Sequence, residues 1–158
     1  MEIVEPVLSK TDRQFRLWRP NAFLMNVLPR IGRGRALDLG CGCGREALAI
    51  AAAGFEVLAC DRLEDALEKG RDMARRYLQG EGIDRSGITW QCVDLEEEGP
   101  PEGRFDLITS FRYLHRPLME SIVDRLRPGG SLVLETFTAT HRERYGKPSS
   151  DRHVLQLG

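Results

Sequence analysis

The stretch that decides the fold is residues 36–44, which read ALDLGCGCG. It begins with a short apolar run, typical of a buried strand in a parallel sheet, and ends with glycine at alternate positions, Gly40, Gly42 and Gly44. A helix is expected over residues 45–53. A sharp turn from strand to helix needs backbone angles that side chains forbid, and a ligand against such a turn needs the Cβ atoms to be absent. The start of the helix adds free N–H donors and partial positive charge. The stretch therefore predicts a ligand-binding loop at the end of a first strand.

Downstream of this loop, short apolar runs alternate with longer amphipathic segments. The pattern predicts further strands at residues 56–60, 88–95, 105–111 and 131–138, and helices at residues 63–78 and 118–126. An acidic loop without a helix is expected at residues 96–103. Parallel neighbours require right-handed crossovers. The order therefore indicates an α/β fold, a doubly wound, mostly parallel sheet with helices on both faces, in three α/β/α layers.

The two ends of the chain extend beyond this core. Residues 15–31 carry apolar side chains at near-helical spacing, so we expect a helix over the ligand edge of the sheet, with plain core packing as the alternative. This helix would lie in an N-terminal segment, residues 1–34, that precedes the core at residues 35–158. Residues 141–158 are polar and contain Gly146 and Pro148. They are expected to form a loop that leads elsewhere.

Composition narrows the class of partner. The chain has 158 residues and a formal net charge of −1, so no broad field favours nucleic acid or an anionic membrane. No signal peptide or membrane-spanning run is recognisable, which predicts a cytoplasmic protein with a small-molecule partner. The four cysteines, Cys41, Cys43, Cys60 and Cys92, lie in or beside apolar strand-like segments and are expected to be reduced core thiols. A second pair of metal ligands is missing from the pattern, so no metal site is predicted.

The glycine spacing distinguishes two kinds of nucleotide site. A dinucleotide fingerprint would have its third glycine or alanine at position 45, where this chain has Arg45, so an NAD-dependent oxidoreductase is disfavoured. Asp61 is expected at the end of the second strand, where a carboxylate can accept hydrogen bonds from both hydroxyls of a ribose. The alternative role for Asp61 is to cap the helix that follows.

Together these residues resemble the class I S-adenosylmethionine-dependent methyltransferases. The loop at residues 38–44 resembles the first motif of that family, Asp61 matches its acidic ribose ligand, and Asp94 matches the residue beside the adenine. Residues 126–130, LRPGG, resemble its segment before the fifth strand. The resemblance covers residues 36–138 and implies a Rossmann-like fold, with S-adenosylmethionine as cosubstrate and no metal. The cofactor-binding residues that it implies are Asp38, Gly40, Cys41, Gly42, Gly44, Asp61, Arg62, Asp94, Leu95 and Phe111.

Within this family, two segments resemble the branch of tellurite-resistance and thiopurine-type methyltransferases. They are residues 111–117, FRYLHRP, and residues 135–138, ETFT. Arg45 also matches an arginine near the active site of the tellurite-resistance type, although a residue in a first helical turn can equally face solvent. The resemblance implies methyl transfer to a small-molecule acceptor.

Catalytic candidates follow from the chemistry of that transfer. In-line displacement at a sulfonium methyl group mainly requires an electron-rich atom to be positioned and water to be excluded. His115, expected just beyond the fourth strand, is a candidate base, with capping or packing against the next helix as its alternative. Tyr113 shares the same loop, and Arg45 completes the catalytic set. Arg112 or Arg116 could bind an anionic acceptor through a guanidinium fork, or could simply be solvated.

A complete class I domain continues past its fifth strand with a helix and two more strands. Residues 141–158 leave too little room for these, so the core is expected to be truncated at its C-terminus, without those strands. If the short form is genuine, the fifth strand would be an exposed edge that could form a homodimer. The main functional alternative is a noncatalytic module that binds S-adenosylmethionine or a partner.

Overall fold

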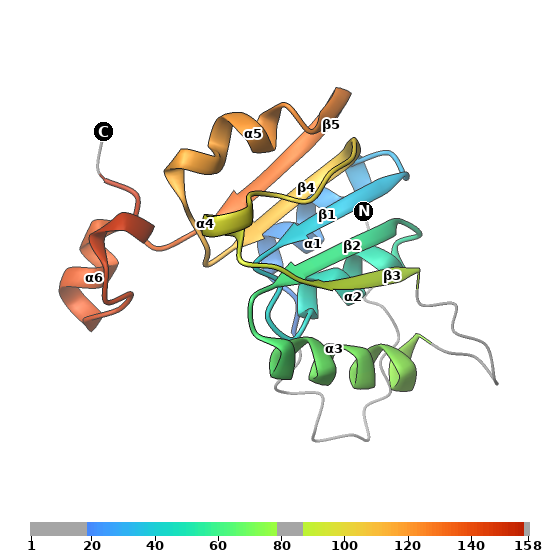
Figure 1. The fold of residues 1–158 in the computed structure, drawn as a ribbon, viewed down its shortest axis with the longest axis horizontal. Helices are drawn as coiled ribbons and strands as arrows, with labels where there is room; N and C mark the ends of the chain where they lie inside the picture. The colour runs from blue at the N-terminus through green and yellow to red at the C-terminus, as the bar shows by residue number, and fades with distance from the viewer. Residues whose placement is uncertain (1–18, 79–86, 157–158) are drawn as a thin grey trace.

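The computed structural model describes residues 19–78 and 87–156. Its core is a five-stranded sheet in the order β3-β2-β1-β4-β5, and every pairing is parallel (Figure 1). The strands are β1 (Arg35–Leu39), β2 (Glu56–Asp61), β3 (Ile88–Cys92), β4 (Phe105–Phe111) and β5 (Leu126–Glu135). The chain winds outward from β1 in one direction and then returns to β4 on its other side. The predicted doubly wound α/β sheet is confirmed.

Helices cover both faces of the sheet. The helices on one face are α1 (Ala22–Val27), its 3-10 extension η2 (Leu28–Arg30), α2 (Arg45–Ala52) and α3 (Glu64–Tyr77), and those on the other are α4 (Leu95–Glu98), η3 (Arg116–Leu118) and α5 (Met119–Val123). Consecutive strand residues point to opposite faces, so Leu107 joins the core cluster under α1 to α3 while Ile108 joins the cluster under α4 and α5. None of the helices in residues 19–78 and 87–156 is long and apolar enough to cross a membrane.

The side chain of Trp90, on strand β3, packs between helix α3 and the glycine loop. The buried residues of α3, Leu67, Gly70 and Ala74, recur at helical spacing and face the sheet. A Cβ atom on Gly70 would lie 2.5 Å from the ring of Trp90, and one on Gly44 would lie 2.3 Å from the same ring. The indole from edge strand β3 therefore packs against two glycines at once, which locks the loop after β1 to α3.

The N-terminal helix is shorter than predicted. It begins at Ala22 because the Asn21 side chain accepts a hydrogen bond from Leu24 N at 3.1 Å and so caps the helix. Asn21 also donates to Glu46 and to Glu135 at the carboxyl edge of the sheet, while Leu24 is completely buried. Both interpretations of the segment therefore hold, since it reaches the ligand edge and packs in the core. Residues 15–18 of the predicted helix lie outside the described residues.

Two strand boundaries were predicted wrongly. The third strand ends at Cys92, because Asp94 caps α4 by accepting from Glu96 N at 3.0 Å, so a short helix occupies part of the predicted acidic loop. The fifth strand begins at Leu126, inside the predicted helix, and α5 already ends at Val123. Residues 128–130 do not stop a helix. They form an irregularity within β5, where the pairing register with β4 shifts.

The segment after β5 folds back on the domain. We call residues 139–156 the return segment. It contains α6 (Ala139–Tyr145) and a 3-10 turn, η4 (Asp151–His153). Leu155 N donates to Phe137 O at 2.8 Å, and Val154 is completely buried. The expected loop leading elsewhere is therefore wrong. In Figure 1, α6 lies beyond the end of the sheet, and the chain then turns back.

Candidate active site

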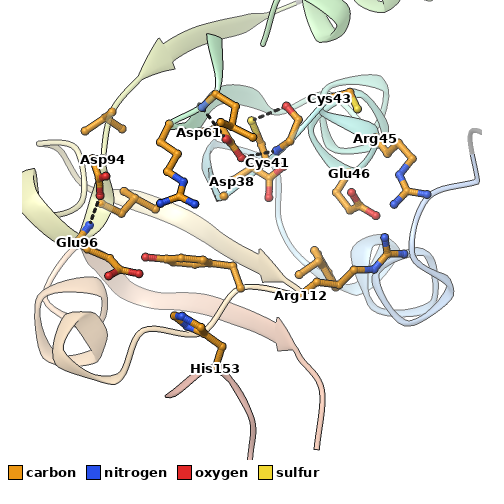
Figure 2. Close-up of a pocket in the computed structure, with 18 of the residues that line it drawn as sticks. Asp38, Cys41, Cys43, Arg45, Glu46, Asp61, Asp94, Glu96, Arg112 and His153 are labelled. Carbon is orange, nitrogen blue, oxygen red and sulfur yellow. Dashed lines mark hydrogen bonds between the residues drawn. The ribbon is translucent and has the colours of Figure 1, made fainter. Parts of the chain in front are cut away.

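A cleft of about 630 Å³ opens where the carboxyl ends of β1, β2 and β4 meet (Figure 2). This is where open α/β sheets bind their ligands, because the strand order reverses there. Its walls come from the loops after four strands and from the return segment. The lining residues are Asp38, Gly40, Cys41, Gly42, Cys43, Arg45, Glu46, Asp61, Arg62, Leu63, Val93, Asp94, Leu95, Glu96, Phe111, Arg112, Tyr113, Pro148 and His153.

The glycine loop has the backbone that its sequence predicts. Gly40, Gly42 and Gly44 have φ values of +63°, +55° and +73°, all in the left-handed region. A Cβ atom on Gly42 would meet no atom of the described chain within 4 Å. Internal packing therefore does not explain glycine at position 42. Its backbone angle does, and so does the open space that a ligand could use.

Asp61 joins the glycine loop to the start of α3. Its Oδ2 accepts from Gly42 N at 2.8 Å and its Oδ1 accepts from Leu63 N at 2.9 Å. The predicted structural role and the predicted ligand role are compatible, because each carboxylate oxygen has a second lone pair for a ligand hydroxyl. Asp61 also lines the cleft.

Asp38 is a buried acid on the floor of the cleft. Burial raises the pKa of this carboxyl to about 7, Thr109 opposes the rise by hydrogen bonding, and the charge of Glu46 adds to it. The Thr109 hydroxyl donates to Oδ1 at 2.7 Å. Oδ2 has no hydrogen-bond partner in the part of the chain that the structure describes. The backbone N–H of Ala47 also interacts with this carboxyl and opposes the rise of its pKa. Oδ2 therefore lies near a protein donor but makes no regular hydrogen bond within the described residues.

The structure brings most of the predicted cofactor-binding residues together. Asp38, Gly40, Cys41, Gly42, Asp61, Arg62, Asp94, Leu95 and Phe111 line the cleft. Gly44 is not among the lining residues, and a Cβ atom on it would clash with the Trp90 ring. The contact of these residues with a ligand stays a prediction, but their convergence from four strand ends is a structural finding.

The predicted catalytic residues separate into two groups. Arg45 and Tyr113 line the cleft, whereas His115 is not among its lining residues. His115 Nδ1 lies 3.8 Å from Glu96 Oε1, and the residue immediately precedes η3. That geometry favours the alternative interpretation, in which His115 packs at the start of the next helix.

Tyr113 lines the cleft and carries a hydroxyl that can donate a hydrogen bond. Its buried hydroxyl makes no hydrogen bond within the described ranges. Burial raises the pKa of Tyr113 to about 12, and the charges of Glu96 and Asp94 add to the rise. The phenol therefore remains neutral near physiological pH and can donate to a ligand.

The two arginines proposed for an anionic acceptor also differ. Arg112 lines the cleft and adopts φ +61°, a left-handed backbone that is uncommon for a residue with a side chain. The Arg116 guanidinium instead donates to the carbonyls of Arg152 and Val154, at 3.0 Å and 2.6 Å. Two hydrogen bonds therefore tie it to the return segment, and the residue is exposed, as the solvation alternative predicts, and is not among the cleft-lining residues. A role of Arg116 in acceptor binding stays a prediction.

Sequence reasoning missed His153 and Pro148, which reach the cleft from the return segment. No local pattern marks either residue, because their position depends on how residues 139–156 dock.

The cysteine prediction was half right: Cys41 and Cys60 are buried, whereas Cys43 and Cys92 are exposed, and all four are free. Burial raises the pKa of Cys60 to about 12. No group of three or more potential metal ligands occurs among the described residues.

Comparison with known proteins gives relatives of similar sequence. Glycine N-methyltransferase of Homo sapiens is 26% identical over 140 residues, which cover 78% of this chain and 48% of that protein. Trans-aconitate 2-methyltransferase of Sinorhizobium fredii is 32% identical over 121 residues, covering 74% of this chain and 44% of that protein. The chain spans about half the length of the curated relatives it matches.

Solved structures share the fold. TehB from Haemophilus influenzae aligns with a TM-score of 0.61 at 19% identity, over 81% of this chain and 50% of that chain. An S-adenosylmethionine dependent methyltransferase from Mesorhizobium loti aligns with a TM-score of 0.57 at 28% identity, over 74% of this chain and 55% of that chain.

The family described as "Methyltransferase domain" matches residues 36–130, more than half of the chain. The match begins at β1 and includes the glycine loop, Asp61 and Asp94. Because the matched residues build most of the sheet and most of the cleft, the chain belongs to the methyltransferase domain family, of the class I S-adenosylmethionine-dependent type.

Proposed function

We propose that this chain binds S-adenosylmethionine in the cleft and transfers its methyl group to a small-molecule acceptor. One observation carries the proposal: Asp61, at the end of β2, holds Gly42 N while both residues line the cleft. A carboxylate fixed in this way against a left-handed glycine loop suits a ribose beside a close backbone approach.

The residues present fit that cosubstrate. Asp61 would accept from the ribose hydroxyls, and Asp94 with Leu95 would hold the adenine. The unpartnered Asp38 Oδ2 suits the cationic amino group of the methionine end. When bound, S-adenosylmethionine supplies an electrophilic methyl group on a sulfonium. The chain would contribute binding, orientation and exclusion of water, with Phe111 and Tyr113 on the wall nearest the acceptor.

The acceptor side suggests a small molecule with negative charge. Arg45 and Arg112 line the cleft, and neither side chain forms an ion pair or hydrogen bond within the described residues. Guanidinium groups recognise carboxylates and similar anions through a planar fork. The names of two relatives, glycine N-methyltransferase and trans-aconitate 2-methyltransferase, refer to small acceptors that carry carboxylates. These observations support an anionic small-molecule acceptor.

Several finer predictions stay predictions. The structural likeness to TehB supports the fold, and membership of the tellurite-resistance branch rests on residues 111–117 and 135–138. Cytoplasmic location and the absence of a nucleic-acid partner also stay predictions.

The outer edge of β5 pairs with no other strand within the described residues. That edge supports the predicted homodimer, which light scattering of the chain would test.

Calorimetry and a transfer assay together test the proposed function. We expect the full chain to bind S-adenosylmethionine and S-adenosylhomocysteine at micromolar concentration and not to bind NAD. Radiolabelled cosubstrate would then be offered with glycine, trans-aconitate and catechol, and we expect labelled product from at least one acceptor. Binding without turnover on a broad panel would favour the noncatalytic module, whereas NAD binding alone would overturn the proposal.

A further inference from the structure

The return segment holds one of its histidines at the mouth of the cleft. Arg116 donates from two guanidinium nitrogens to the carbonyls on either side of His153, those of Arg152 and Val154. Thr136 Oγ1 donates to the His153 carbonyl at 3.2 Å, and the neighbouring Val154 side chain is completely buried. Three anchors therefore fix the backbone around a single side chain that lines the cleft.

The contacts of the imidazole determine its tautomer. His153 Nδ1 lies 2.7 Å from Leu114 O. A carbonyl oxygen can only accept, so Nδ1 carries the hydrogen and Nε2 of the neutral ring has a free lone pair. The ring stacks on Tyr113, with centroids 6.4 Å apart and planes 26° apart. Nε2 has no hydrogen-bond partner among residues 19–78 and 87–156.

His153 lines the cleft on the side proposed for the acceptor. Figure 2 shows His153 across the cleft from Asp38 and Asp61, the residues assigned to the cosubstrate. A nitrogen base held by one ring nitrogen and open at the other is the arrangement that general-base catalysis requires. His115 lacks it, because the structure places that residue outside the cleft lining.

We propose that His153 is the general base of the reaction and that the acceptor carries a proton on its attacking atom, as a hydroxyl or an amine does. This inference rests on the proposed function. The acceptor lone pair forms the new bond to the methyl carbon, and the carbon–sulfur bond breaks with its electron pair going to sulfur. The acceptor proton moves to His153 Nε2. Leu114 O then stabilises the imidazolium through the Nδ1 hydrogen bond.

The chain offers a matched pair of variants for the test. His153→Asn keeps a donor for Leu114 O and removes the base. His141→Asn changes a second histidine of the return segment, whose ring packs 4.8 Å from Phe137 and 4.7 Å from Tyr145 and does not line the cleft. With glycine as the proton-bearing acceptor, we expect His153→Asn to lower kcat about 100-fold and His141→Asn to change it less than about twofold. Trans-aconitate attacks through a carboxylate that bears no proton, so its kcat should fall much less in His153→Asn.

Two further measurements do not depend on turnover. In the full chain labelled with [15N]histidine at mildly alkaline pH, two-bond correlations should show His153 protonated at Nδ1, with the variants assigning the signals. Diethyl pyrocarbonate should modify His153 at Nε2. A ring protonated at Nε2 alone would overturn the proposal, as would an unchanged kcat for glycine in His153→Asn. If the wild-type chain did not bind S-adenosylmethionine, the proposed function would be overturned instead. The failure of the general-base proposal and the failure of the proposed function are therefore distinguishable.

Discussion

The cleft has a side proposed for the cosubstrate, with Gly42 and Asp61, and a side proposed for the acceptor, with Tyr113 and His153, and the two are built in different ways. The cosubstrate side comes from consecutive βαβ units, in which Asp61 reaches back 19 positions to hold Gly42 N. The acceptor side joins Tyr113, next to the end of β4, to His153 on the return segment, and the hydrogen bond between His153 and Leu114 crosses 39 positions. One side is fixed by the geometry of neighbouring turns and the other by docking of a distant segment.

This difference indicates how each side should respond to substitution. On the cosubstrate side the structure depends on left-handed backbone angles and on the absence of Cβ atoms. A single added methyl group is therefore enough to disturb it. On the acceptor side the structure depends on hydrogen bonds from side chains to carbonyls, such as those of Arg116. Substitutions on the first side should alter stability and cosubstrate binding together, whereas substitutions on the second should alter turnover with little change in cosubstrate affinity.

The largest expected effect is at Gly44. Gly44→Ala combines a left-handed backbone, φ +73°, with a Cβ atom 2.3 Å from the Trp90 ring. The backbone strain costs about 1–2 kcal/mol and overpacking costs about 1–3 kcal/mol more. We expect the free energy of unfolding to fall by roughly 2–5 kcal/mol and S-adenosylmethionine binding to be lost, as measured by denaturant unfolding and calorimetry.

Gly42→Ala is the control for that experiment. Its φ of +55° imposes similar backbone strain, but its Cβ atom would meet no atom of residues 19–78 and 87–156 within 4 Å. The expected loss of stability is therefore only about 1–2 kcal/mol. If the two variants were equally destabilised, the contact between Trp90 and Gly44 would not be what fixes the loop.

Asp61 should show the next largest effect. Asp61→Ala removes the acceptor of Gly42 N and Leu63 N as well as the predicted ribose ligand. Since hydrogen bonds to charged groups each contribute about 1.5–3 kcal/mol, the Kd for S-adenosylmethionine should rise about 100-fold or more. His115→Ala, outside the cleft lining, should leave that Kd within about twofold. Equal affinities of the two variants in calorimetry would contradict the assignment of the cosubstrate side.

The sequence correctly predicted that the glycine loop and Asp61 come together, because the determinants of that arrangement are local. Alternating glycines after an apolar run require one kind of turn, and an aspartate at the end of the next strand must lie beside it once the strands are parallel. The error at the end of the third strand came from side-chain capping, whereas the error at the start of the fifth came from an irregular strand pairing. Asp94 begins α4 by accepting from Glu96 N, a contact that hydrophobic periodicity does not reveal.

The acceptor side could not be predicted for a physical reason. His153 lies in a polar segment whose sequence has no clear period, and it reaches the cleft only because Val154 is buried and Arg116 binds the adjacent carbonyls. Such contacts depend on the whole tertiary structure. His115, by contrast, was predicted as a base from its place after β4. It directly precedes η3 and is not among the cleft-lining residues.

Asp38 links stability to pH on the cosubstrate side. Its pKa rises from 3.8 to about 7 on folding, so its contribution to stability is complete below about pH 4 and is lost as the pH rises through 7. Asp38→Asn cannot ionise and keeps an acceptor for Thr109. Each pKa unit is worth about 1.4 kcal/mol, and the buried amide offsets part of that gain. The cost of the buried amide is the same at every pH, so the stability of the variant relative to wild type should be about 4 kcal/mol higher at about pH 8 than at about pH 4, measured by urea unfolding. An equal gain at both pH values would contradict the raised pKa.

Arg112 offers the smallest effect and tests whether the acceptor side also depends on strained backbone. Its N–H donates to Glu135 O at 2.8 Å, and its φ of +61° is more costly for any side chain than for glycine. Arg112→Gly should therefore be more stable than Arg112→Ala by about 1 kcal/mol in thermal unfolding. Both variants lose the guanidinium, so both should raise the KM for an anionic acceptor equally while the Kd for S-adenosylmethionine stays unchanged. If the alanine variant were as stable as the glycine variant, the left-handed backbone would carry no strain. If both also kept the wild-type KM, the side chain would not contact the acceptor, and residue 112 would belong to neither side of the cleft.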